Sequence, residues 1–265
     1  MVNKNYFLAN ELILIDRFPS GETHAQWERL MTGVTIEYHA RNWSDIMNLI
    51  LLDRTAKAAK ADVQWFMPFM PFARHDRRRT FHDCNDLHLA MEMLKGIRVC
   101  VADPHSYVSE VMPYIPQRDC VNGLMGTGGF DVDVVCIPDH GATKKAHEWF
   151  INTGAEWIVQ GSKVRDPKTG DLSGFSIDDP HRVKGSRVMI YDDICDGGAT
   201  FIGLADVLRK HGAAQINLGV THGLFTKGLG EILRTFDQVF TYSNTEIEGV
   251  DTVCWKRLYE GGNAV

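Results

Sequence analysis

RVMIYDDICDGGATFIG (residues 187–203) combines the patterns of a strand, a turn and the start of a helix in one short stretch. The apolar run 188–191 is typical of a strand buried on both faces of a parallel sheet. Small residues at 196–200 form a turn, and the apolar residues of 201–211 then recur with helical spacing up to Gly212. The stretch therefore predicts an α/β fold, with a helix N-terminus placed directly after the carboxyl end of a strand.

This turn also predicts an anion site. Backbone N–H groups at Gly197 and Gly198, together with the positive end of the helix dipole, suit a phosphate. Asp192 and Asp193 are poor neighbours for a phosphate but good acceptors for vicinal hydroxyls, or ligands for Mg²⁺. The combination favours a sugar phosphate, and the alternative is an ordinary turn with solvated aspartates. The stretch has neither the Lys-Ser/Thr pair of a Walker loop nor the GxGxxG spacing of a dinucleotide site.

The same stretch resembles the ribose-phosphate loop of type I phosphoribosyltransferases and phosphoribosyl pyrophosphate synthetases, in which two acidic residues precede an acidic-Thr-Gly-Gly-Thr turn. The resemblance implies two similar doubly wound α/β domains with mostly parallel sheets, an ATP-side domain at 1–125 and a ribose-phosphate domain at 126–265. It implies a ribose-phosphate site made of Asp192, Asp193, Asp196, Gly197, Gly198, Ala199 and Thr200. Gly197 stands where the family has threonine, and Ala199 stands where it has the second glycine. These departures leave the identity of the sugar phosphate open.

The composition is that of a soluble enzyme. A chain of 265 residues, 44% hydrophobic and 23% charged, is long enough for two compact domains. The net charge of -6 argues against a surface for nucleic acid or an anionic membrane. Six cysteines without a CxxC pair and a start without a secretory pattern favour reduced thiols and a cytoplasmic enzyme. No apolar run approaches the roughly 20 residues of a membrane-spanning helix.

The segment 17–22, Arg-Phe-Pro-Ser-Gly-Glu, is a turn by its Pro and Gly content. It resembles the Arg-Phe-x-x-Gly-Glu loop with which phosphoribosyl pyrophosphate synthetases hold the adenine of ATP in a neighbouring subunit. The resemblance implies that Phe18 stacks on the base, that Glu22 accepts from its amino group, and that Ser20 stands where the family usually has aspartate. It implies a homo-oligomer, either a dimer or a hexamer, and the alternative is a plain surface turn.

A second segment, 71–79, places four arginines within six positions just after the strand predicted at 63–67. Because arginine binds phosphate bidentately, this cationic run suits a triphosphate, and a solvated basic turn is the alternative. It resembles the family's Tyr-Ala-Arg-Gln-Asp-Arg segment. The resemblance implies an ATP site made of Arg74, His75, Asp76 and Arg77.

Two further strand ends carry candidate metal ligands. Asp103 and His105 follow the strand predicted at 99–102, and Asp139 follows the strand predicted at 132–137. Open α/β sheets bind ligands at the carboxyl ends of their strands, although such residues are often only satisfied turns. The family's corresponding segments supply magnesium ligands, so the resemblance implies Mg²⁺ as the cofactor.

Lys163 and Arg165 come after the strand predicted at 156–160 and begin a polar stretch that continues to Gly185. In an extended segment these two cations point the same way, and a long stretch without periodicity is typical of a lid or of disorder. The family's catalytic loop begins with a similar Lys-x-Arg. The resemblance implies that Lys163 and Arg165 are catalytic, and two solvated cations are the alternative.

Together these segments predict an enzyme that transfers the diphosphoryl group of Mg-ATP to the 1-hydroxyl of a ribose 5-phosphate unit and releases AMP. Free ribose 5-phosphate is the family's usual acceptor. A phage-type relative that uses ADP-ribose for NAD rebuilding makes ADP-ribose the second candidate. The alternatives are a phosphoribosyltransferase, which would not need ATP, and a non-catalytic regulatory relative. The expected partners are therefore small molecules, with no nucleic acid and no membrane.

Overall fold

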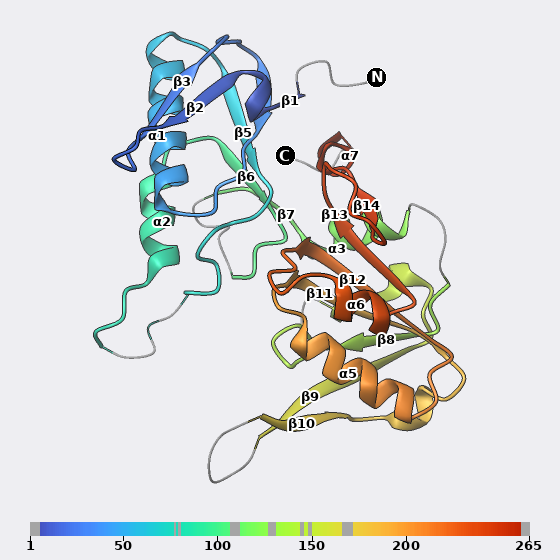
Figure 1. Ribbon diagram of the computed structural model, residues 1–265. Helices are drawn as coiled ribbons and strands as arrows, with labels where there is room; N and C mark the ends of the chain where they lie inside the picture. The colour runs from blue at the N-terminus through green and yellow to red at the C-terminus, as the bar shows by residue number, and fades with distance from the viewer. Residues whose placement is uncertain are drawn as a thin grey trace. The chain divides into compact units, whose positions relative to one another are not determined.

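The computed structural model describes residues 6–76, 78, 81–106, 112–126, 131–143, 146–147, 150–165 and 172–260. The chain divides into two compact units, one of Met1–Pro116 with Tyr259–Val265 and one of Gln117–Leu258 (Figure 1). Residues 117–125 thus lie in the second unit, whereas the domain boundary predicted after residue 125 assigns them to the first.

Within its described residues, the first unit contains a parallel sheet, an antiparallel hairpin and two α-helices. Its elements are β1 Tyr6–Leu8, η1 Ala9–Glu11, β2 Ile13–Arg17, β3 Thr23–Trp27, β4 Val34–Glu37, α1 Trp43–Ala58, β5 Val63–Met67, α2 Asp86–Leu94, β6 Val99–Ala102 and β7 Tyr114–Ile115. The sheet has the order β1-β4-β5-β6-β7, and β2 pairs with β3 in the separate hairpin.

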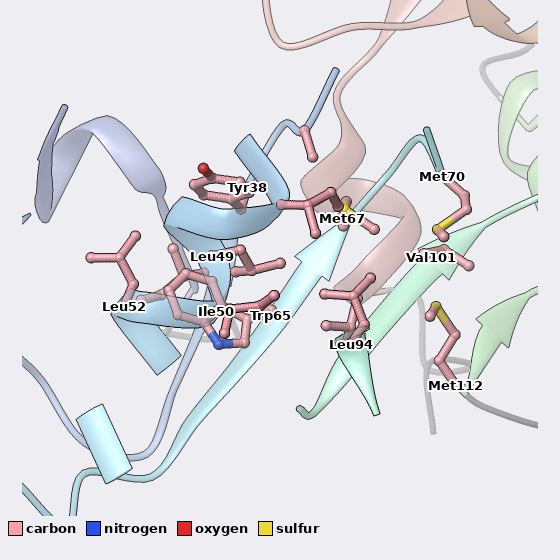
Figure 2. Packing of buried hydrophobic residues seen from close by; sticks show 14 of the residues in the cluster. Tyr38, Leu49, Ile50, Leu52, Trp65, Met67, Met70, Leu94, Val101 and Met112 are labelled. Atoms are coloured by element: carbon pink, nitrogen blue, oxygen red, sulfur yellow. The ribbon is translucent and has the colours of Figure 1, made fainter. Parts of the chain in front are cut away.

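The core of the first unit lies where α1 and α2 cover the parallel sheet (Figure 2). Leu49 of α1 and Leu94 of α2 are almost fully buried against Trp65 and Met67, which β5 presents on that face. Each such side chain contributes about 1.5–3 kcal/mol when it leaves water. This packing fixes β5, and with it the segment that follows the strand.

The second unit is a larger sheet with helices on both faces. Its elements are α3 Gln117–Met125, β8 Val134–Ile137, η2 Phe150–Thr153, β9 Trp157–Arg165, β10 Leu172–Ile177, η3 Pro180–Arg182, β11 Arg187–Cys195, α5 Ala199–Lys210, β12 Gln215–Gly223, α6 Gly230–Thr235, β13 Gln238–Tyr242 and β14 Asp251–Val253, followed by α7 Trp255–Glu260. The sheet order is β10-β9-β8-β11-β12-β13-β14, in which only the β9–β10 pair is antiparallel.

Helix α5 buries Leu204 and Leu208 against Val188 and Ile190 of the central strand β11. On the opposite face, Val121 and other residues of α3 line a small apolar cavity together with residues of β11. Helices on both faces explain why β11 is apolar along most of its length. The predicted fold class, α/β with mostly parallel sheets, is confirmed.

The helices in the described residues include none that is long and apolar enough to cross a membrane. The longest of them, α1, has 16 residues. All six cysteines lie in the described part of the chain as free thiols.

Candidate functional site

The charged residues predicted on three neighbouring strands of the second unit come together at the carboxyl edge of the sheet. Strands β9, β8 and β11 are adjacent, and Lys163, Asp139 and Asp192 lie at or just past their carboxyl ends. Lys163 Nζ lies 3.9 Å from Asp139 Oδ2, and the charge of Asp139 acts on the carboxyl of Asp192. One edge of the sheet therefore holds two carboxylates and a cation in the same region.

The Asp139 carboxylate is fixed by its own turn. Its Oδ1 accepts from the backbone N–H groups of Gly141 at 2.9 Å and Ala142 at 3.3 Å, while its Oδ2 is the atom nearest Lys163. About half of the side chain is exposed (49%). An oriented, accessible carboxylate fits Mg²⁺, which proteins bind through one or two carboxylates together with substrate phosphates. Among the described residues, no group of three or more His, Cys, Asp or Glu could hold a metal ion without such help.

Lys163 belongs to a strand rather than to an irregular lid. Strand β9 continues to Arg165, and Lys163 pairs with Phe175 of the antiparallel strand β10. The prediction that the polar stretch from Lys163 to Gly185 lacks regular structure is therefore wrong for β10 Leu172–Ile177. This strand was missed because it contains Gly174 and alternates poorly in polarity. Lys163 and Arg165 are both in extended backbone, as predicted, and the side chain of Arg165 lies outside the described residues.

Buried Gln160 ties the base of β9 to the neighbouring strand. Its Nε2 donates to the carbonyl of Ile137 in β8 at 3.3 Å, and its Oε1 accepts from Thr143 Oγ1 at 2.6 Å. Thr143 closes the loop that contains Asp139, so one glutamine links the strand of Lys163 to the loop of Asp139. Asp139 and Lys163 are thereby held on a common, rigid support.

Asp192 is strongly perturbed by its surroundings. Burial raises the pKa of its carboxyl well above the usual range, and the negative charges of Asp193 and Asp139 raise this pKa further. The backbone N–H of Asp193, which donates to Asp192 Oδ1 at 2.9 Å, opposes the rise in part. Such crowding of carboxylates is typical of a site that binds a cation or hydroxyl groups.

The predicted phosphate turn connects β11 to α5. Gly198, at φ 80°, precedes the helix, and no side chain caps the helix N-terminus. The first N–H groups of α5, from Ala199 and Thr200 onward, therefore lack a side-chain acceptor and are suited to an anion. Asp196 points into the adjacent loop, where Thr226 Oγ1 donates to Asp196 Oδ1 at 2.6 Å.

Gly198→Ala tests this turn. Because the left-handed backbone of Gly198 costs an L-residue about 1–2 kcal/mol, we expect the free energy of unfolding to fall by about that amount. A Cβ would also lie 3.0 Å from Ile232 Cδ1, which adds steric pressure. Urea denaturation measures the loss. Gly230→Ala at the start of α6 is the control and should not destabilise the fold, because its φ is not positive and a Cβ would meet only Arg234 Nη1 at an ordinary contact distance of 3.6 Å.

In the first unit, the predicted adenine loop is the turn of the β2–β3 hairpin. Phe18 N–H donates to the Glu22 carbonyl at 2.8 Å, and Ser20 Oγ donates to Glu22 Oε2 at 2.8 Å. The Phe18 ring is 54% exposed. An exposed aromatic ring on an ordered hairpin turn can stack on a flat ligand, so the geometry allows the predicted role.

Of the predicted triphosphate contacts, Arg74, His75 and Asp76 are described and Arg77 lies outside the described residues. His75 Nδ1 lies 2.9 Å from Oδ2 of Asp86 in the first turn of α2, and the side chain of His75 remains mostly exposed. Asp86 thus orients the imidazole while leaving its other nitrogen accessible.

The predicted metal residues of the first unit lie just past β6. Asp103 is 1% exposed and has φ 36°, a left-handed conformation that aspartate tolerates better than most residues. Its N–H donates to the carbonyl of Ile115 at 2.8 Å, which holds the backbone in place. His105 is exposed two residues later. Unusual backbone of this kind is common at functional sites.

The sequence-based interpretation missed Lys227, which lies against the phosphate turn. A Cβ built on Gly197 would come within 3.1–3.3 Å of three carbons of the Lys227 side chain. It also missed the contacts of Thr226 and Asp86. Lys227 follows the carboxyl end of β12, and that position was the signal by which it could have been found.

Comparisons with known proteins agree with this arrangement. The family model "Phosphoribosyl transferase domain" matches residues 146–256. A ribose-phosphate pyrophosphokinase of Mycoplasmopsis pulmonis is 28% identical over 86% of this chain and 70% of its own length. The ribose-phosphate pyrophosphokinase of Thermoplasma volcanium is 24% identical over 91% of this chain and 86% of its own length.

Among solved structures, the phosphoribosylpyrophosphate synthetase of Mycobacterium smegmatis matches with a TM-score of 0.77 at 19% identity. That match covers 96% of this chain and 95% of the other. At this identity the structural match shows the fold alone. The similarity in sequence to the two ribose-phosphate pyrophosphokinases covers most of the chain. The chain is therefore similar in sequence to ribose-phosphate pyrophosphokinases over most of its length, and it has the fold of a phosphoribosylpyrophosphate synthetase.

Proposed function

We propose that this protein is an ATP-dependent diphosphokinase that transfers the β,γ-diphosphoryl group of Mg-ATP to the 1-hydroxyl of a ribose 5-phosphate unit. The names of its relatives support this reaction. The observation that carries the proposal is the meeting of Lys163, Asp139 and Asp192 at one sheet edge beside the phosphate turn. An ordinary surface turn would not gather a cation and two carboxylates from three strands.

The acceptor would bind to the second unit. Asp192 and Asp193 would accept hydrogen bonds from the ribose hydroxyls, since an ionised carboxylate has acceptors and no donor. The 5-phosphate would lie on the turn 196–200, where the uncapped N–H groups of α5 point toward the ligand.

In the transfer step, the oxygen of the 1-hydroxyl forms a bond to the β-phosphorus of ATP, and the bond from this phosphorus to the α–β bridging oxygen breaks. AMP leaves with that oxygen, and the hydroxyl proton passes to solvent. Such a transfer needs alignment and charge neutralisation more than covalent help. Lys163 and Arg165 would supply positive charge to the transferring group.

The nucleotide would bind to residues of the first unit. Arg74, His75, Asp76 and Arg77 would hold the triphosphate, and Phe18, Ser20 and Glu22 would hold the adenine of a neighbouring subunit in a homo-oligomer. The candidate ligands of Mg²⁺, directly or through water, are Asp103 and His105 in the first unit and Asp139 in the second. When bound, this ion neutralises charge on the phosphates.

Phe18→Ala should raise the KM for ATP about 10-fold, because stacking of a base on an aromatic ring contributes about 1–3 kcal/mol. The free energy of unfolding should change little, since the ring is 54% exposed. Steady-state kinetics with varied ATP measures the effect. The control is Phe81→Ala, which removes an 88% exposed ring outside the proposed site and should leave the KM unchanged. Equal changes in both variants would contradict the role of Phe18.

The acceptor is either ribose 5-phosphate or ADP-ribose. Gly197 lacks the hydroxyl that the threonine of the family provides, which leaves both acceptors as candidates. The experiment is incubation of the purified protein with Mg-ATP and each acceptor, followed by measurement of AMP. Equal or better turnover of ribose 5-phosphate would defeat ADP-ribose as the preferred acceptor. If no AMP forms with either acceptor, the proposed function is wrong, since a diphosphokinase must form AMP in proportion to the ATP that it consumes.

A further inference from the structure

The loop after β12 is fastened to the phosphate turn by several hydrogen bonds. The N–H of Phe225 donates to the carbonyl of Cys195 at 3.1 Å, and the N–H of Thr226 donates to the carbonyl of Asp196 at 2.9 Å. Thr226 Oγ1 adds its bond to the carboxylate of Asp196 at 2.6 Å. These bonds join the loop to both the strand end and the turn. They therefore hold the backbone of the next residue, Lys227, beside the turn.

The Lys227 side chain runs across the face of Gly197. A Cβ on Gly197 would lie 3.1 Å from Cδ, 3.2 Å from Cε and 3.3 Å from Cγ of Lys227. These distances are tight, so any side chain at position 197 would require the lysine stem to shift by a few tenths of an ångström. Because a C–N bond adds only about 1.5 Å, the ammonium of Lys227 lies within about 5 Å of this point. Gly197 and Lys227 therefore fit together as a pair.

Within the part of the chain that the structure describes, no hydrogen bond or ion pair accounts for the position of Lys227. Its side chain is exposed, and it makes no hydrogen bond or ion pair with another described residue. A lysine ammonium is strongly hydrated and flexible, so packing of the stem alone does not require the charge. The charge stands instead beside the uncapped first turn of α5.

We infer that Lys227 binds the phosphoryl end of the acceptor, together with the N-terminal N–H groups of α5. This inference rests on the proposed function, because it assigns the anion at the turn to the acceptor. In this chain a cation from the β12 loop takes the place of the threonine hydroxyl that the family carries at position 197. A point charge adds attraction in proportion to the negative charge of the acceptor, whereas a hydroxyl adds one directed hydrogen bond.

The test variant is Lys227→Met, which keeps the stem against Gly197 and removes the charge. Isothermal titration calorimetry with ribose 5-phosphate, and separately with ADP-ribose, should show affinity about 10- to 100-fold weaker than in the wild type for the acceptor that binds, the range expected for one lost charge-assisted hydrogen bond. The KM for that acceptor should rise equally, while the KM for ATP stays unchanged and kcat changes less than about threefold. Added salt should weaken acceptor binding more in the wild type than in Lys227→Met.

Two further variants separate charge from structure. Lys210→Met removes the same charge at the opposite end of α5 and should leave acceptor affinity unchanged. Gly197→Ala should displace the lysine stem and weaken acceptor binding with Lys227 still present. Lys227→Arg should restore part of the affinity, and thermal denaturation of each variant should confirm an intact fold.

The outcomes distinguish this inference from the proposed function. Wild-type AMP release with an unchanged acceptor affinity in Lys227→Met would overturn the role of Lys227 and leave the diphosphokinase standing. A wild type that binds an acceptor through Lys227 but forms no AMP would overturn the diphosphokinase alone. Failure of the wild type to bind either acceptor would overturn the inference.

Discussion

Lys163→Met is expected to lower kcat for AMP release by about 100- to 1000-fold, the loss that follows removal of one preorganised charge-stabilising donor. Lys163 Nζ lies 3.9 Å from Asp139 Oδ2 at the sheet edge and is only about one-third exposed (34%). Strand pairing with β10 and the anchoring of β9 by Gln160 hold its backbone, so the charge is positioned before the substrate arrives. Quenched-flow or steady-state measurement of AMP gives kcat directly.

The separate effects of Lys163→Met on kcat and on KM show whether Lys163 acts on the transferring group or on substrate binding. If Lys163 acts on the transferring group, kcat and kcat/KM should fall together while the affinity for the acceptor persists. Lys184→Met, a surface lysine of the same unit away from the sheet edge, should behave as the wild type. A Lys163→Met protein that keeps more than a third of the wild-type kcat would remove Lys163 from the proposed mechanism.

The parallel strands were the part of the fold that the sequence predicted best. The strands predicted at 63–67 and 99–102 match β5 and β6 residue for residue. Strands buried on both faces are continuous apolar runs, which makes their limits visible in the sequence. The sequence therefore also predicts that the site residues at the ends of such strands, including Asp139 and Asp192, lie at a common edge of the sheet.

Edge and hairpin strands were harder to predict. Strand β10 contains Gly174 and alternates poorly, and β3 lies in a hairpin whose exposed positions are polar. Each depends on pairing with a partner strand more than on its own propensity. For this reason the sequence predicted an irregular lid beginning at Lys163, whereas Lys163 lies in β9, which pairs with β10.

Contacts between segments that are distant in the chain could not be predicted from the sequence. Lys227 meets Gly197 across 30 positions, and His75 meets Asp86 across 11. The periodicity of the sequence does not predict which of the loops that follow the strands contact each other, because these contacts depend on the order of the strands in the sheet. The order β8-β11-β12 in the sheet brings the loop after β12 beside the turn after β11.

Asp192→Asn is expected to weaken acceptor binding about 10- to 100-fold and to stabilise the fold at the same time. The first effect follows from the loss of a charged acceptor for the ribose hydroxyls, since hydrogen bonds to charged groups are worth about 1.5–3 kcal/mol. The second follows because burial, Asp193 and Asp139 all disfavour the negative charge on Asp192 in the folded protein. Calorimetry with the acceptor measures the first effect, and thermal denaturation measures the second.

The pH dependence gives the stability effect a definite sign. The folded-state pKa of Asp192 is raised, so at a pH above that value the folded protein holds a disfavoured carboxylate and is destabilised. As the pH falls through the raised pKa toward the unfolded value of about 3.9, Asp192 takes up a proton in the folded state and the penalty disappears. Asp192→Asn, which is neutral throughout, should therefore melt above the wild type at high pH. This advantage should vanish at low pH.

Asp206→Asn, at an exposed position on α5, is the control and should show neither effect. If the stability gain of Asp192→Asn persists at low pH, relief of charge crowding is not its cause.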